Sequence, residues 1–232
     1  HEIRLETADV LHQLGRSGDA AALCREVLAW PAGQRPSDSV CLSLRRKLLA
    51  LEPSDYTTLF DLALNHVALN ESDAAMPLLG EVVRQALERG DPDTALRAAE
   101  QALGLRPGDP DLMEWLARAQ KAAGRRAEFE KTLADLVACG RCGLAVEWFA
   151  ERAHAAMGDS NWKEGETFVK KWMDLAPDDA EAVERFAEVC LHLRRTPKAV
   201  EHFERAAALH RAAGRLDRCI SALTRGLDAD PD

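Results

Sequence analysis

Two cysteines close together in the sequence are the residues with the clearest potential for chemistry. The segment Cys139-Gly-Arg-Cys142 has the spacing of half a zinc site or of a redox pair. A structural zinc site needs two more ligands; His154 is a third candidate, and no fourth follows at a suitable spacing. A matching turn earlier in the chain, Leu14 to Ser17, contains no cysteine. We therefore expect both cysteines to be structural, with no metal and no cofactor bound.

Other arrangements typical of catalysis are missing from the sequence. The 7 histidines form no HExxH motif, and no GxSxG motif or glycine-rich phosphate loop after a strand occurs. Carboxylate pairs such as Asp178 and Asp179 lie where helices are expected to start, and carboxylates there cap the helix and complement its dipole. His66 is expected to be a core histidine with a hydrogen-bonded ring nitrogen. The chain is therefore predicted not to be an enzyme.

Composition limits the classes of partner. The 232 residues are 47% hydrophobic, enough for a substantial core, and 30% charged. A net charge of −9 argues against nucleic acid as a partner, because neutralising phosphates requires a basic surface. No run of about 18 apolar residues exists, so membrane insertion is not expected. The 6 scattered cysteines suit a reducing compartment, and a cytoplasmic location is the resulting expectation.

The chain contains an internal duplication, which must position any functional residue. Residues 175–232 align without a gap on residues 51–108 when shifted by 124 positions, and helix breakers meet helix breakers. Identities include Pro53 with Pro177, Asp55 with Asp179, Ala63 with Ala187, Leu69 with Leu193, Ala75 with Ala199, Gly90 with Gly214, Ala98 with Ala222 and Leu103 with Leu227. This pattern is typical of repeat proteins. We predict a first copy over residues 1–125 and a truncated second copy over 126–232, in one continuous solenoid taken from a longer chain.

Hydrophobic periodicity predicts an all-α fold. Helices are expected over about 2–14, 19–30, 37–51, 56–69, 72–89, 91–105 and 111–123 in the first copy, and over 127–139, 144–157, 161–175, 180–193, 198–213 and 216–227 in the second. No stretch has the period of a strand. Short turns between helices imply antiparallel neighbours. The predicted architecture is a right-handed α-solenoid of antiparallel helical hairpins.

Seven positions in the second copy have the spacing of a known helical repeat. They are Val183, Phe186, Ala187, Cys190, Ala199, Phe203 and Ala206. This order of large and small residues resembles the tetratricopeptide repeat (TPR). The first copy matches less strictly, with Leu59, Leu62, Ala63, His66, Ala75, Leu79 and Val82. The resemblance departs in spacing: the turn prolines lie 54, 70 and 54 residues apart rather than 34, and 54 residues accommodate three helices.

The resemblance implies a concave groove lined by the first helix of each pair. Carried over to this sequence, the partner-binding positions are Thr57, Phe60, Leu64, Val67 and Ala68 in the first copy, and Glu181, Glu184, Glu188, Leu191 and His192 in the second. Phe60, Leu64 and Val67 form an apolar stripe, which either is covered within the chain or binds a partner. The glutamates favour a basic stretch of that partner.

The leading hypothesis is a non-catalytic interaction scaffold or adaptor, which binds a partner helix or peptide segment that is apolar with a basic flank. Scaffolds of this kind are similar to those of bacterial motility, secretion and envelope assembly, by analogy alone. The alternatives are a peptide-sensing module of a larger transcriptional or signalling regulator and a helical accessory domain of an enzyme. Ile220 and Leu223 are expected to be partly uncovered on the last helix, which permits end-to-end self-association.

Overall fold

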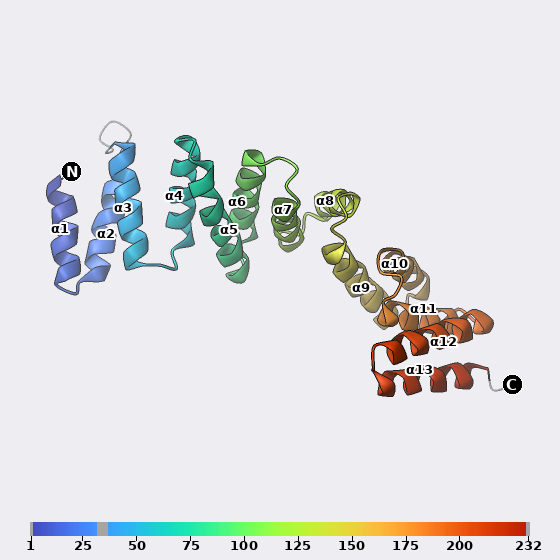
Figure 1. Ribbon diagram of the computed structural model, residues 1–232. Helices are drawn as coiled ribbons and strands as arrows, with labels where there is room; N and C mark the ends of the chain where they lie inside the picture. Colours follow the sequence, from blue (N-terminus) through green and yellow to red (C-terminus); the bar gives the residue numbers. More distant parts are fainter. Residues whose placement is uncertain (1, 32–36, 231–232) are drawn as a thin grey trace. The chain divides into compact units, whose positions relative to one another are not determined.

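A computed structural model describes residues 2–31 and 37–230 of the chain (Figure 1). Within these residues the chain forms 13 helices and no strand. Their bounds are α1 Glu2–Gln13, α2 Ser17–Leu28, α3 Asp38–Leu51, α4 Tyr56–Ala68, α5 Ser72–Glu88, α6 Pro92–Leu105, α7 Pro110–Ala122, α8 Arg126–Ala138, α9 Gly143–Gly158, α10 Trp162–Leu175, α11 Ala180–His192, α12 Thr196–Ala212 and α13 Leu216–Ala229. The all-α prediction is confirmed. Most of the connection between the helices expected over 19–30 and 37–51 lies outside the described residues.

The helices belong to two compact units, residues 1–132 and residues 133–232, which divide within α8. In unit 1, each helix from α1 to α7 packs against the next one along the chain. In unit 2, α9 to α13 do the same. Each unit is therefore a stack of helical hairpins, in which a helix buries its apolar face only against its neighbours.

The sequence offset of 124 also relates the helix bounds. The segments α3 to α6 and α10 to α13 start and end at positions that differ by 124 at every terminus, as α4 (56–68) and α11 (180–192) illustrate. Equivalent helices in the two copies are followed by residues with a left-handed backbone conformation. Gly90 and Gly214 have φ of 71° and 72°, and Asn70 and Arg194 have φ of 59° and 60°. A predicted boundary at residue 125 stays a prediction.

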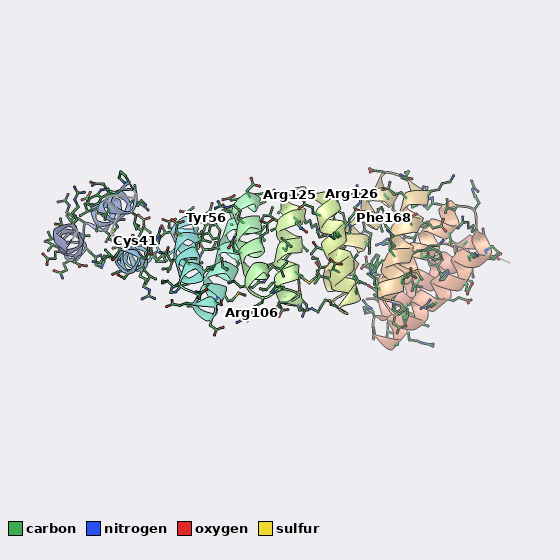
Figure 2. All side chains as sticks on the ribbon, turned by 90° about the horizontal axis from the view of Figure 1, so that it is seen from above. Cys41, Tyr56, Arg106, Arg125, Arg126 and Phe168 are labelled. Atoms are coloured by element: carbon green, nitrogen blue, oxygen red, sulfur yellow. The ribbon has the colours of Figure 1, made fainter. Side chains whose placement is uncertain are left out.

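Helix starts follow the capping rules in part. Asp55 accepts a hydrogen bond from the Thr58 amide, and its counterpart Asp179 accepts one from the Glu181 amide. Ser72 and Asp73 are helix-capping residue types by sequence, but Glu71 holds the N-cap position of α5 and makes no side-chain capping hydrogen bond. Figure 2 labels Tyr56 at the start of α4. Its hydroxyl donates to Asp91, the N-cap residue of α6, at 3.0 Å and so connects the two helices.

The core contains the positions that carry the repeat resemblance. All 14 of those residues, seven in each copy, are at most 9% exposed. Five of the seven in unit 1 belong to a cluster that also contains residues of α6 and α7, and five of the seven in unit 2 belong to a cluster that also contains residues of α9 and α10. His66 is 4% exposed with Nδ1 at 2.6 Å from Glu71 Oε2, as expected for a core histidine. These clusters fix the rotation of α4 and α11, and so decide which side chains face outwards.

Candidate partner-binding surfaces

One face of α4 is open in unit 1. Thr57, Asp61 and Ala68 are exposed and Leu64 is half-buried, at intervals of four, three and four residues that place them on a single helix face. We call these four residues the α4 stripe. Thr57 donates to Asp55 Oδ1 at 2.6 Å, and Asp61 lies 3.6 Å from Arg45 Nη2. Three predicted site residues, Thr57, Leu64 and Ala68, thus lie on an accessible surface.

Phe60 does not lie on that face. It is 5% exposed and belongs to the core cluster with residues of α5 and α6. The guanidinium of Arg97, from α6, lies 5.1 Å from its ring centre. Val67 is half-buried against the same cluster. Of the two alternatives stated for the apolar stripe, cover within the chain therefore holds at Phe60, where residues of α5 and α6 pack over this side of α4.

The equivalent face of α11 in unit 2 is charged. Adding 124 to the α4 stripe gives Glu181, Arg185, Glu188 and His192, which we call the α11 stripe; Glu181 and His192 are exposed, and the other two are half-buried. The imidazole of His192 stacks on the Trp162 indole of α10, with ring centres 3.6 Å apart and planes 5° apart. Three predicted site residues therefore belong to this stripe.

Glu184 is buried, although the sequence predicts it on the open face. It is 5% exposed, in the position equivalent to Phe60. Its carboxylate accepts a hydrogen bond from Arg225 Nη1 of α13 at 3.0 Å and lies 3.2 Å from His210 Nε2 of α12. The physical reason is the same as for Phe60. Helix α13, which is equivalent to α6, packs over this side of α11. A carboxylate is retained there because it has ionic partners.

Arginines neutralise most of the charge on the α11 stripe. Arg185 Nη1 donates to both oxygens of Glu188 at 2.9 Å, and Arg225 Nη1 lies 2.5 Å from Glu188 Oε1. Burial lowers the pKa of Arg185, but the hydrogen bond to Glu188 and the charges of the three nearby glutamates together outweigh it, and the pKa is raised. The three glutamates at 181, 184 and 188 face two arginines, which leaves one net negative charge rather than three. Arg185 is not among the predicted site residues, although its spacing from Glu181 and Glu188 indicates ion pairs within the helix.

A polar hollow of about 640 Å³ adjoins the start of α4. Its lining includes Arg25, Glu52, Asp55, Thr57 and Arg89. Arg25 forms an ion pair with Glu52 and lies 3.6 Å from Asp55 Oδ2. Burial opposes ionisation of Asp55, but hydrogen bonds from threonines 57 and 58 more than offset it and lower its pKa. Arg25, Glu52 and Asp55 in this hollow therefore already pair with one another, whereas the Arg89 guanidinium lies over the Tyr56 ring.

The cysteine pair of the CGRC segment makes no site with its candidate histidine. Cys139 is exposed and Cys142 half-buried, and both are free thiols. His154 instead meets Trp172 edge-on, with ring centres 5.7 Å apart, and lies 3.5 Å from Glu181. Among the described residues, no three His, Cys, Asp or Glu side chains are grouped to hold a metal ion. No helix in the described ranges has the length and apolar character needed to cross a membrane.

The chain is similar to repeat proteins in sequence and in structure. Two tetratricopeptide repeat models match residues 86–141 and 150–214. Similar solved structures include a MamA protein, at 11% identity over 92% of this chain and 93% of that one, with a TM-score of 0.39. A tetratricopeptide repeat protein from Parabacteroides merdae matches at 11% identity over 99% and 93%, with a TM-score of 0.37. A chain of the APC/C Cut9–Hcn1 complex matches at 14% identity over 95% and 48%, with a TM-score of 0.35. No curated protein matches the sequence.

The two family matches and the architecture of helical hairpins together identify the chain as a TPR-like helical repeat protein.

Proposed function

We propose that the chain is a non-catalytic protein-interaction scaffold that binds a segment of a partner protein along the α4 stripe. Repeats of this type suggest protein binding in general, and the observation that supports the particular surface is the row of four residues on α4 that the core leaves uncovered. Thr57 and Ala68 are small, and Leu64 presents part of its side chain between them. A helix or extended segment can therefore approach the backbone of α4 closely.

The chemistry of the stripe suggests an apolar segment with a basic flank. Leu64 and Ala68 offer apolar surface towards the end of α4, whereas Asp61 and Thr57 are polar and lie nearer its start. Asp61 is exposed and its contact with Arg45 is 3.6 Å long, so a partner lysine or arginine can approach its carboxylate. Pairs of this kind at the rim mainly set the association rate and its salt dependence.

The α11 stripe is proposed as a second contact surface of different character. Its internally paired glutamates contribute little attraction, and its accessible groups are Glu181 and the face of the His192–Trp162 stack. Aromatic surfaces with polar edges are frequent in protein interfaces. This surface would bind polar or cationic side chains rather than a long apolar segment.

Substitutions on α4 test the proposal. Proteins that bind the wild-type chain are first captured and identified. The affinity of the bound segment is then measured for the wild type and for each purified variant. Leu64→Asp and Ala68→Arg are expected to abolish binding, because they place charge and bulk in the stripe. Leu69→Asp is the matched control: that leucine is 47% exposed and follows α4 immediately, off the stripe.

Melting temperatures distinguish lost binding from lost folding. Ala68 is exposed, so Ala68→Arg should melt within a few degrees of the wild type and still fail to bind. Equal binding by wild type, Ala68→Arg and Leu64→Asp would show that the partner uses another surface.

A further inference from the structure

Arg45 is a nearly buried cation in unit 1. It lies on α3, and its side chain is only 11% exposed. Leu49 lies four residues further on, on the same face of the helix, and packs against the core cluster that contains Phe60. Nε of Arg45 is fully enclosed and has no hydrogen-bond partner within the described ranges. A desolvated cation is costly unless it is paired and hydrogen-bonded, so packing alone does not account for this residue.

Asp61 of α4 is a weak partner for this cation. Its Oδ2 lies 3.6 Å from Arg45 Nη2, which is too long for a hydrogen bond. The Asp61 side chain is also 57% exposed, so water screens the attraction. A guanidinium carries five N–H donors, and in the described part of the chain none of those of Arg45 has an acceptor.

The second copy shows that the fold does not require a charge at this place. Position 45 corresponds to Val169, which is fully buried in the core cluster of unit 2. Position 61 corresponds to Arg185, which donates hydrogen bonds to Glu188 of its own helix. An apolar side chain therefore satisfies the packing, and a buried charge adds nothing to it. The presence of Arg45 in the first copy indicates a role other than folding.

The terminal nitrogens of Arg45 lie at the edge of the α4 stripe. Nε is fully enclosed whereas Nη1 and Nη2 are not, and Nη2 lies next to Asp61, a member of the stripe. When a partner lysine or arginine pairs with Asp61, Arg45 shares its one distant carboxylate with a second cation. The bound segment therefore has to bring an acceptor to Arg45.

A main-chain carbonyl is the acceptor that suits this position. A partner carboxylate beside Arg45 would also approach Asp61, and the two negative charges would repel each other. A carbonyl is neutral, and the basic residue that pairs with Asp61 brings one in its own main chain. In a helix the carbonyls before the last turn are bonded to amides four residues further on, whereas an extended segment leaves its carbonyls free.

We propose that Arg45 determines the conformation of the partner segment. Its terminal nitrogens donate to a main-chain carbonyl of an extended segment, whose basic side chain pairs with Asp61. This inference rests on the proposed function and deepens it, because of the two forms of segment that can approach α4 it selects the extended one.

Peptides selected on the whole 232-residue chain test the proposal. A phage-displayed library of short random peptides is first depleted on Ala68→Arg and then selected on the wild type, and affinities are measured by fluorescence anisotropy. Arg45→Val introduces the residue of the second copy. It should weaken binding about tenfold or more, because a hydrogen bond to a charged group is lost. Arg46→Val, at the exposed neighbouring arginine, is the matched control and should bind as the wild type does.

Changes in the selected peptide identify the acceptor. Replacing each Asp, Glu, Asn or Gln of the peptide by alanine should leave the effect of Arg45→Val in place, because the acceptor belongs to the main chain. A side-chain crosslink that holds the peptide helical should abolish binding. Loss of the effect at any one of these side chains, or tighter binding of the helical peptide, overturns the proposal.

Stability measurements separate a binding role from a structural one. Hydrogen exchange in α3 and α4 should be no faster in Arg45→Val than in the wild type, because a valine satisfies the packing. Faster exchange there, or equal peptide binding by wild type and Arg45→Val, would contradict the inference alone. The proposed function fails, and the inference with it, if no peptide is selected or if the selected peptides bind Leu64→Asp as tightly as the wild type.

Discussion

Replacing Phe60 by alanine measures how much α4 depends on the packing of α6. The side chain is 95% removed from solvent and contacts core residues of α5 and α6. Truncating a buried phenylalanine usually costs about 3–5 kcal/mol, because apolar contacts are lost and a cavity remains. That range includes the cost of losing the contact between the Phe60 ring and the Arg97 guanidinium. We expect Phe60→Ala to destabilise unit 1 by this amount, whereas Leu64→Ala, at a half-buried position, costs roughly half as much or less.

Native-state hydrogen exchange with mass spectrometry is the suitable assay, because it resolves the two units. Exchange in α4, α5 and α6 should accelerate in Phe60→Ala in proportion to the lost stability, and exchange in α11 to α13 should stay unchanged. A global melting curve would mix the two units and hide this difference. A loss below about 1 kcal/mol, within the range of ordinary surface substitutions, would refute the assignment of Phe60 to the core.

Three further predictions follow from local features. Arg194→Gly should stabilise unit 2 by about 1 kcal/mol in urea denaturation, because Arg194 has φ of 60°, whereas Gly214→Ala, at φ of 72°, should destabilise it. Cys142→Ser should leave the melting temperature unchanged, and metal analysis of the wild type should return no stoichiometric zinc. Hydrogen bonds from Arg84 and Gln85 lower the pKa of Glu81 to about 2 from its ordinary 4.5. Its ionised form therefore contributes stability above pH 4.5 that is lost as the pH falls towards 2, and Glu81→Gln should show a flatter loss of stability in acid.

Most of the fold could be predicted from the sequence, because local signals agree with tertiary packing. Glycines 90 and 214 lie beyond helix ends, and aspartates 55 and 179 cap helix starts. Each of these signals acts within a few residues, and the duplication supplies every one of them twice. The cap of α5 was harder to predict, because Glu71, Ser72 and Asp73 are all polar and only the backbone decides which of them is the cap.

The candidate site was predicted less well, because exposure depends on helix rotation. Phe60 and Glu184 are one residue away from Asp61 and Arg185, which corresponds to about 100° around a helix. Positions carried over from a two-helix repeat take no account of a third helix, and here α6 and α13 cover that side. The charge of Glu184 suggested exposure, but its partners Arg225 and His210 lie 41 and 26 residues away in sequence. No local pattern reveals an ion pair of that range.

The equivalence of residues 60 and 184 has a consequence for folding fidelity. Tandem copies with equal helix lengths are prone to misassembly, in which a helix of one copy packs into the other. If α6 packed against α11 and α12, Gln101 would stand where Arg225 stands, and the buried carboxylate of Glu184 would lose its cation. Leaving a buried charge without its partner costs about 3–5 kcal/mol. The unlike residues at this one shared position, Phe60 and Glu184, therefore disfavour packing of α6 into the second copy.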